Sequence, residues 1–496
     1  MIGRNRVGFN NSIVQGIYSI QEKIQNMDVA YAGIVVTYVC TQIAITLPVI
    51  LIPVIAADPY AAGAIIPETA STISSAAFVG QIVSISVLGA GVGKLFNGFI
   101  CKAIGGRVSG SIYMFGLAAF SLLLSTTSLY HSIAIAGMEF CASIMWTAVS
   151  VLMANKFEND PDPKKFTDAI TSLSLASTSG TLIAKTFGGA LLSMFHWRQV
   201  CFFATFAALL GSAVLFFSVN DNDISSGSQT KGRSNTRIKI ANNGGRRNIK
   251  NSNSMVISKS GSKEMNDSNE NGLAGIISSI STVMANPLFW MVGFSHFCSF
   301  IVRSSDKVLG TFIFDATNLP RSLCGPLTTS VTLGFIGGLV SGREINDLET
   351  IGEKRTFVAK RYGLAALSAV GLALCSNENA ISIVGQYGLA GAITVFSGLL
   401  AAMVGFQFYQ FIPKYATSFG QNKAVYISLT DACAFLLLSP FWSTISGIVA
   451  SSEQSGWAIS WLIIAGFMAM GGAVMTSLLP TVLRLEGYDQ DIKKKL

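Results

Sequence analysis

The residues of this sequence that are most able to do chemistry are the charged ones inside long apolar segments. Four basic ones occupy such segments: Lys94, Lys185, Arg303 and Lys307. Two acidic ones, Asp306 and Asp431, accompany them. An ionisable side chain deep in hydrocarbon costs roughly 2.5–3.5 kcal/mol on insertion scales, so it is retained where it pairs or serves a ligand. Because the bases outnumber the acids, the sequence predicts that a negatively charged solute completes the charge balance.

The spacing of these residues places them on shared helix faces. Lys185 continues a polar stripe at helical intervals, formed by Ser174, Ser177, Thr178 and Thr181. Arg303 and Lys307 are four residues apart and share a face. A polar face on a helix in lipid must turn toward other helices or a cavity. We predict that Lys94 and Arg303 contact one anionic group and that Lys185 adds to the positive field.

Each basic residue also has a structural interpretation. The stems of Lys94 and Lys307 are long enough to carry their ammonium groups to a membrane interface. Arg303 has Asp306 three residues away as an alternative partner. These interpretations stay open beside the binding hypothesis.

The acidic residues and one histidine form a second set of candidates. Asp431 fits either a structural partner for Lys185 or a proton relay. His296 fits either a satisfied interior histidine or a group that couples transport to protons. We therefore predict that Asp431, Asp306 and His296 are charge partners or coupling groups of the site.

Motifs for enzymatic or metal chemistry are absent from the sequence. No HExxH or GxSxG pattern occurs, nor a pair of carboxylates at helical spacing within the apolar segments. The eight cysteines are scattered, mostly in apolar segments, and form no CxxC pair. They fit small buried hydrophobic residues better than metal ligands or disulfides. The sequence predicts a protein that is not an enzyme and that uses no cofactor or metal.

The elements that must position these side chains are apolar segments of membrane-spanning length. The chain has 496 residues, of which 50% are hydrophobic and 12% charged, about half the charged fraction of a typical soluble protein. Its apolar runs reach about twenty residues, which fits transmembrane helices and exceeds a β-barrel strand. Twelve runs are predicted, at 29–56, 72–100, 108–126, 132–154, 168–194, 200–219, 287–314, 326–342, 357–375, 381–411, 424–450 and 457–480. The predicted fold is an all-α polytopic membrane protein with twelve transmembrane helices in two pseudo-symmetric six-helix halves.

A long polar segment rich in Ser, Asn and Gly divides the chain between the sixth and seventh runs. The predicted parts are a cytoplasmic N-terminus (1–28), an N-terminal six-helix half (29–219), a cytoplasmic linker whose last part fits an interfacial helix (220–285), a C-terminal six-helix half (286–480) and a cytoplasmic tail (481–496). The stretches 93–98 and 337–342 echo each other at the second run of each half. This echo favours an internal repeat.

The positions of Lys and Arg predict the orientation. Outside the spans, only Arg198 and Arg321 fall on the side opposite the linker, so both termini are predicted to be cytoplasmic. The net charge of +8 comes largely from these flanks and the linker, and it does not predict nucleic-acid binding. The chain ends in residues 493–496, Lys-Lys-Lys-Leu, which fits either a dilysine retrieval signal of the endoplasmic reticulum or ordinary anchoring in a plasma or organellar membrane.

The stretch between the second and third runs carries a family resemblance. Gly98, Ile100, Gly105 and Arg107 match the signature G-x-L-x-D-R-x-G-R-R of the major facilitator superfamily, whereas Lys102 replaces its acidic residue. With twelve spans divided into six and six, the chain resembles that superfamily. The resemblance implies a central site exposed alternately to the two sides of a bilayer. It also implies a gating loop that includes Gly98, Gly105 and Arg107.

Two shorter stretches resemble the organophosphate:phosphate antiporters within that superfamily. The segment 93–98 around Lys94 is similar to a pattern whose lysine lines the transport cavity. The segment 299–303 is similar to the one that holds the family's phosphate-binding arginine, here Arg303. The family's arginine in the first span is replaced, and the resemblance implies that Thr41 or Gln42 supplies neutral hydrogen bonds there.

The sequence therefore predicts a secondary transporter for a small organic anion or phosphorylated metabolite. Its expected partners are this solute, the lipid bilayer and a coupling ion or counter-substrate. Two alternatives stay open. One is a carrier of the same superfamily for a neutral solute such as a sugar, peptide or drug. The other is a non-transporting sensor on a carrier scaffold, which the altered signature and the long linker favour.

Overall fold

The computed structural model consists of α-helices and their connections, without a strand, in the part of the chain that it describes. That part comprises residues 28–57, 75–126, 131–157, 163–219, 273–342, 344–407, 415, 423–452 and 455–485. The first helices are α2 (Val29–Ala57), α4 (Ser75–Ile104), α5 (Gly106–Thr126), α6 (His131–Phe157), α7 (Pro163–Met194) and α8 (Trp197–Ser218). They are followed by α10 (Leu273–Met284), α11 (Pro287–Thr317), α12 (Arg321–Leu327), α13 (Thr329–Ser341), α14 (Glu344–Asp347), α15 (Ile351–Cys375), α16 (Glu378–Gly405), α18 (Lys423–Ser451) and α19 (Gly456–Leu485).

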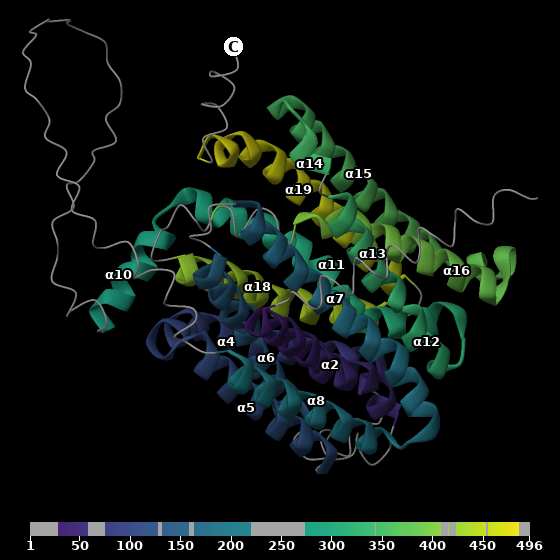
Figure 1. The fold of residues 1–496 in the computed structure, drawn as a ribbon. Coiled ribbons are helices and arrows are strands. Elements are labelled where there is room, and N and C mark those ends of the chain that lie inside the picture. The colour runs from purple at the N-terminus through teal and green to yellow at the C-terminus, as the bar shows by residue number, and fades with distance from the viewer. Residues whose placement is uncertain are drawn as a thin grey trace, which may run out of the picture.

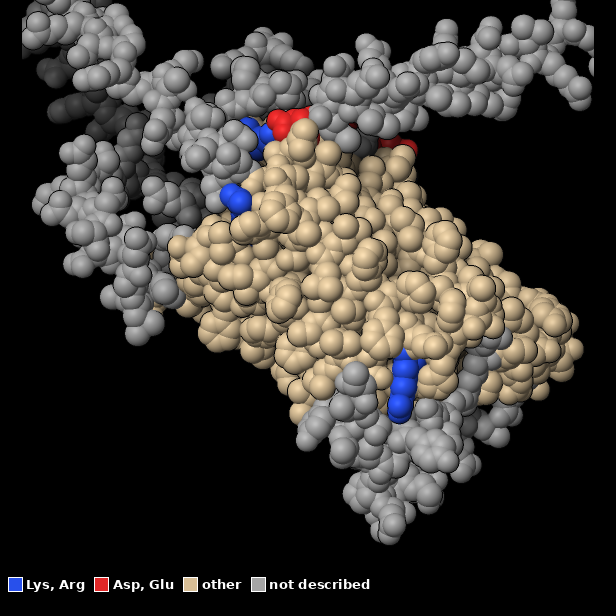
Figure 2. All heavy atoms as spheres, turned by 60° about the horizontal axis from the view of Figure 1, so that its bottom comes forward, with Lys and Arg blue, Asp and Glu red and all other residues tan. Residues whose placement is uncertain are grey.

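Ten helical segments of the described chain are long and apolar enough to cross a membrane. The helices α7 and α11, of 32 and 31 residues, have the length but carry the polar stripe around Lys185 and the charged turn around Arg303. Figure 2 shows a face on which uncharged residues cover most of the described surface, with charged side chains near its edges. The chain is a polytopic membrane protein, and the count of twelve spans stays a prediction.

The helices form two neighbouring groups (Figure 1). We call the helices before residue 220 the N-half and those from α11 onward the C-half. The helices α7, α11 and α18 lie where the two halves meet. The longest contact between them runs along α4 and α18. Ser84 on α4 donates a hydrogen bond to the carbonyl oxygen of Ser439 at 2.9 Å, and Lys94 reaches Asp431 at 2.6 Å. Residue numbers rise along α4 as they fall along α18. The two helices are therefore antiparallel, as the second and eleventh spans should be.

The connection between α4 and α5 is a single residue. Gly105 has a φ of 81°, in the left-handed region that glycine adopts without a steric penalty, and its N–H donates to the carbonyl oxygen of Cys101 at 3.0 Å. Gly98 and Arg107, which the sequence placed in a gating loop, lie instead within α4 and α5. The glycine turns the chain so sharply that no longer loop is needed.

The last part of the predicted linker forms α10, which packs through Val283 near Phe289 and Tyr426. Its location at a membrane interface stays a prediction. The predicted N-terminal segment up to residue 27, the linker from 220 to 272, and the tail from 486 with its terminal lysines lie outside the described residues.

Small residues allow α13 and α16 to approach each other closely. A Cβ atom added to Gly334 would lie 2.1 Å from the backbone oxygen of Gly398, and one added to Gly338 would lie 2.4 Å from that of Ala402. In lipid, helix association depends on such close packing because burial of apolar surface does not drive it. These glycines therefore determine how tightly the C-half can pack.

Substituting Gly334→Ala should lower the thermal stability of the purified protein. The added methyl group meets backbone rather than a movable side chain, and overpacking of this kind costs about 1–3 kcal/mol. Gly363→Ala on α15 is the matched control, because a Cβ there meets nothing within 4 Å. Thermal unfolding of both variants in detergent tests the packing, and equal melting temperatures would contradict it.

Candidate functional site

A cavity of about 210 Å³, the central cavity, lies between the two halves. Its lining comes from α2, α4, α6 and α7 of the N-half and from α11, α13 and α18 of the C-half. The residues predicted for the site that line it are Gln42, Lys94, His296, Arg303, Asp306 and Asp431. A second cavity of about 220 Å³ is lined by Lys185 and shares Asp306 and Lys307 with the first. The folded chain thus gathers most of the predicted site at the interface between the halves.

Lys94 and Asp431 form a buried ion pair across this interface. Nζ of Lys94 lies 2.6 Å from Oδ2 of Asp431, and the two side chains are 6% and 7% exposed. The other carboxylate oxygen lies 2.9 Å from Nε2 of His296. Since an ionised carboxylate only accepts hydrogen bonds, His296 donates through Nε2. Asp431 therefore balances Lys94 rather than Lys185, its partner in the sequence-based alternative.

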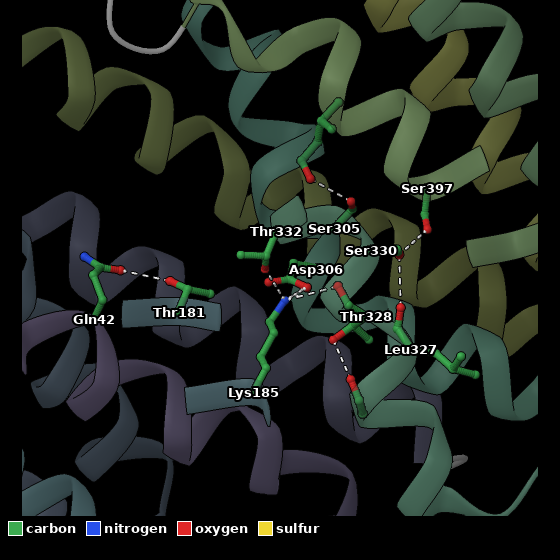
Figure 3. A network of polar contacts seen from close by, with 12 residues as sticks. Gln42, Thr181, Lys185, Ser305, Asp306, Leu327, Thr328, Ser330, Thr332 and Ser397 are labelled. Carbon is green, nitrogen blue, oxygen red and sulfur yellow. Dashed lines mark hydrogen bonds and ion pairs between the residues drawn. The ribbon is translucent and has the colours of Figure 1, made fainter. Parts of the chain in front are cut away.

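Lys185 is bound by three acceptors of the C-half (Figure 3). Its Nζ lies 2.5 Å from Oδ1 of Asp306, 3.0 Å from the hydroxyl of Thr332 and 3.3 Å from the carbonyl oxygen of Thr328. An ammonium group has three N–H donors, so this set can use all of them. Asp306, the carboxylate considered as a partner for Arg303, thus binds a lysine of the opposite half.

Lys307 forms a third ion pair, with Glu139, which is not among the residues predicted for the site. Its Nζ lies 2.5 Å from Oε1 of Glu139 and 2.9 Å from the hydroxyl of Ser86. Glu139 lies on α6 and is buried. The criterion that found the other charges, an ionisable residue inside an apolar run, would have found this one too. The ammonium groups of Lys94 and Lys307 are bound inside the protein and do not extend to an interface.

These pairs reduce the positive surplus that the sequence suggested. Among the described residues, the lining of the two cavities contains four basic side chains and, with Glu139, three acidic ones, which leaves an excess of one positive charge. Each carboxylate accepts a hydrogen bond from a lysine of the opposite half. The same groups that set the charge of the site therefore also join the halves.

Arg303 lies on α11 in the wall of the central cavity, with its guanidinium carbon 5.6 Å from the ring centroid of Phe300. This distance is within the range of a cation–π contact. The arrangement combines a planar cationic group with an aromatic surface on one side of the cavity. Such a wall can contact both the charged and the apolar part of a small organic molecule.

Gln42 and Thr41, the two candidates on α2, are adjacent in sequence but point in different directions. Gln42 lines the central cavity, and its Oε1 accepts a hydrogen bond from Thr181 at 3.5 Å. Thr41 lines neither cavity: its hydroxyl donates to the carbonyl oxygen of Thr37 at 2.9 Å and lies 3.2 Å from the sulfur of Met114 on α5. Successive side chains on a helix point in directions about 100° apart, so only one of the two can face the cavity.

The residues predicted for gating lie away from both cavity linings. Arg107 donates from Nε to the carbonyl oxygen of Phe216 at 3.1 Å, and its guanidinium carbon lies 4.8 Å from that ring's centroid. It thereby ties the start of α5 to the end of α8. A gating role for Gly98, Gly105 and Arg107 stays a prediction.

The family model described as Major Facilitator Superfamily matches residues 34–398. The chain belongs to this superfamily. A crystal structure of a mutant of the nucleoside transporter NupG has a similar fold, with a TM-score of 0.53 and 12% sequence identity over 89% of this chain and 99% of that one. At this identity the likeness shows the fold alone. No curated protein matches the sequence.

Membership of the Major Facilitator Superfamily supports membrane transport of a small solute rather than an enzymatic activity. In a major facilitator protein the substrate site is expected near the middle of the bilayer, between the two halves. The central cavity occupies that position between the halves of this chain. Two of the ion pairs, Lys94–Asp431 and Lys307–Glu139, lie in the wall of this cavity.

Substituting Lys94→Gln should destabilise the protein by about 3–5 kcal/mol, because removing one partner of a buried pair leaves an uncompensated charge. The double variant Lys94→Gln/Asp431→Asn should regain much of this loss. Thermal unfolding of the wild type, both single variants and the double variant provides the measurement. A double variant that loses the full sum of the two single effects would show that the side chains do not interact.

Proposed function

We propose that this protein is a secondary transporter that carries a small organic anion across a membrane by alternating access. The observation that carries the proposal is the excess of one basic group among the charged side chains that line the two cavities. A charge shielded from water is costly unless it is compensated. An organic acid or a phosphorylated metabolite would provide that compensation.

Arg303 is the principal anion contact in this proposal. Its planar guanidinium group suits the paired oxygens of a carboxylate or phosphate. Phe300 lies beside it for the apolar part of the solute, and Gln42 and Thr181 on the N-half offer neutral hydrogen bonds. Lys94 takes part by exchange, since its ammonium group is already bound to Asp431.

The ion pairs also suggest how binding is coupled to movement. All three connect the N-half to the C-half. An anion that competes for one of these lysines weakens a contact between the halves and shifts the balance between conformations. Asp431, Asp306 and His296 then hold the charge balance when the solute has left, and a coupling ion or counter-substrate acts on the same groups.

A neutral solute is the second candidate, favoured by the pairing of three of the four basic residues with carboxylates. The central cavity also has an aromatic and hydroxyl-rich lining that includes Tyr38, Trp146, Phe435 and Ser177. Such a lining suits a hydroxylated ring compound, and NupG, which shares the fold, is a nucleoside transporter. Direct uptake measurements separate the two candidates.

We further propose that both termini face the cytoplasm, on the basis of the Lys and Arg distribution, with the endoplasmic reticulum as one candidate membrane from the terminal lysines. A plasma or organellar membrane is the alternative. Fluorescent fusions at each end, read out in intact and selectively permeabilised cells, test both points.

Uptake into proteoliposomes should depend on Arg303. Arg303→Gln is expected to reduce uptake of the true substrate about tenfold or more, because a charge-assisted hydrogen bond contributes about 1.5–3 kcal/mol. Arg303→Lys should retain part of the activity. Arg198→Gln, at the start of α8 and outside both cavity linings, is the matched control.

The panel for this assay contains organic acids, phosphorylated metabolites, inorganic phosphate, nucleosides and sugars. Uptake restricted to uncharged compounds would establish the second candidate and reject the anion. Binding without uptake of any compound would support a sensor instead of a carrier.

A cross-link between α4 and α18 should block transport. The hydroxyl oxygens of Ser84 and Ser439 lie 3.0 Å apart, so cysteines at both positions are close enough for a disulfide. Oxidation of the double cysteine variant should reduce uptake to background, and a reductant should restore it. The single cysteine variants should not respond to the oxidant. Full transport in the cross-linked protein would exclude separation of these helices from the cycle.

A further inference from the structure

The second cavity is displaced from the central one along the same helices. On three helices, the residues that line it come later in the chain than those that line the central cavity. The two sets run over 38–49 and 46–54 on α2, over 177–181 and 185–193 on α7, and over 296–307 and 306–314 on α11. On α4 the order is reversed, since Val79 lines the second cavity and residues 87–94 line the central one. The second cavity therefore lies toward the ends of α2, α7 and α11 and toward the start of α4.

The linker between the halves leaves from the other side of the protein. It follows α8, which ends at Ser218. A Cβ atom added to Gly33, near the start of α2, would meet the side chain of Ser218. The start of α2 and the end of α8 thus lie together, at the opposite end of α2 from the second cavity. The two cavities are therefore arranged in series, with the second one farther from the linker.

The boundary between the cavities consists of residues that line both of them. Thr46 and Val49 contribute from α2, and Asp306 and Lys307 contribute from α11. The carboxylate of Asp306 is bound to Lys185 on α7, whereas the ammonium group of Lys307 is bound to Glu139 on α6. Adjacent residues of one helix of the C-half are thus tied to two helices of the N-half at this boundary.

Lys185 connects the walls of the two cavities. It lines the second cavity, and its Nζ lies 3.3 Å from the carbonyl oxygen of Thr328 in the same wall. The same ammonium group lies 3.0 Å from the hydroxyl of Thr332, which lines the central cavity, and 2.5 Å from Asp306, which lines both (Figure 3). All three acceptors belong to the C-half. Separation of the halves at this end would therefore release them together.

We infer that the second cavity is the part of the transport path on the side of the membrane opposite the linker. The contact of Lys185 with its three C-half acceptors, the Lys185 gate, closes this part off from the central cavity. Polar and charged side chains within a membrane mark such paths, and movement of one half against the other opens them in turn. The inference rests on the proposed transport function but not on the charge of the solute.

Side-specific labelling with the membrane-impermeant thiol reagent MTSET tests the path in proteoliposomes of the full-length protein. Gly310 lines the second cavity, and a Cβ there would meet its nearest neighbour at 3.8 Å, so Gly310→Cys fits. A protease site inserted between residues 220 and 272 identifies the orientation, because external protease cuts only molecules whose linker faces outward. External MTSET should modify Cys at 310 about tenfold or more faster in uncut than in cut molecules, because the thiol reacts where water reaches it.

Two further cysteine variants serve as references for this labelling. Ala142→Cys, in the lining of the central cavity, should react from both sides as the protein alternates. Gly363→Cys on α15 lines neither cavity and should react from neither side. Modification at 310 should also block uptake of the compound panel. Equal labelling of Gly310→Cys from both sides, no labelling from either side, or full uptake after modification would each overturn the inference.

The Lys185 gate has its own test in the Ala142→Cys background. Lys185→Met should raise the rate of labelling from the side opposite the linker several-fold, whereas Lys185→Arg should keep the rate close to that of the parent. Lys156→Met is the matched control, because it removes the ion pair with Asp28 outside both cavity linings. An unchanged rate in folded Lys185→Met would exclude the gate, and the labelling of Gly310→Cys tests the path even if Lys185→Met does not fold. Uptake restricted to uncharged compounds would reject the proposed anion and leave this path intact.

Discussion

Ammonium groups in a low-dielectric environment must be compensated by negative charge, and the contacts between the two halves of this protein provide that compensation. Lys94, Lys185 and Lys307 each carry a charge that lipid cannot stabilise, and each finds a carboxylate on the opposite half of the chain. These pairs determine which helix faces meet at the interface. They also leave the cavities lined by charges whose compensation can change when a solute enters.

The remaining architecture allows the ion pairs to form. Close contact between α4 and α18 brings Lys94 to Asp431, and the small residues between α13 and α16 shape the C-half that carries Thr328 and Thr332. The packing of glycine against backbone replaces the hydrophobic driving force that lipid does not provide. Ion pairs and close packing of small residues thus both contribute to the association of these helices in a bilayer.

A transporter must make its internal contacts strong enough to define each state and weak enough to exchange. Ion pairs across the halves suit both requirements, because the anionic solute that we propose would compete with the protein's own carboxylates for the same donors. The central and second cavities meet at Asp306 and Lys307, adjacent residues that pair with different helices of the N-half. The two cavities therefore share one turn of α11 in their walls.

The sequence by itself determined the helical spans, the membrane setting and the set of charged candidates, because hydropathy and the cost of buried charge act on local segments. It also contained the signal for Glu139, an ionisable residue within an apolar run. The sequence did not show which of these charged residues pair with each other. Lys94 and Asp431 are 337 positions apart, so only the packing of α4 on α18 decides that they meet. The packing of α2 against α7 and α8 decides in the same way that Gln42 faces the cavity while Thr41 turns away, because the rotation of a helix about its axis is set by its neighbours.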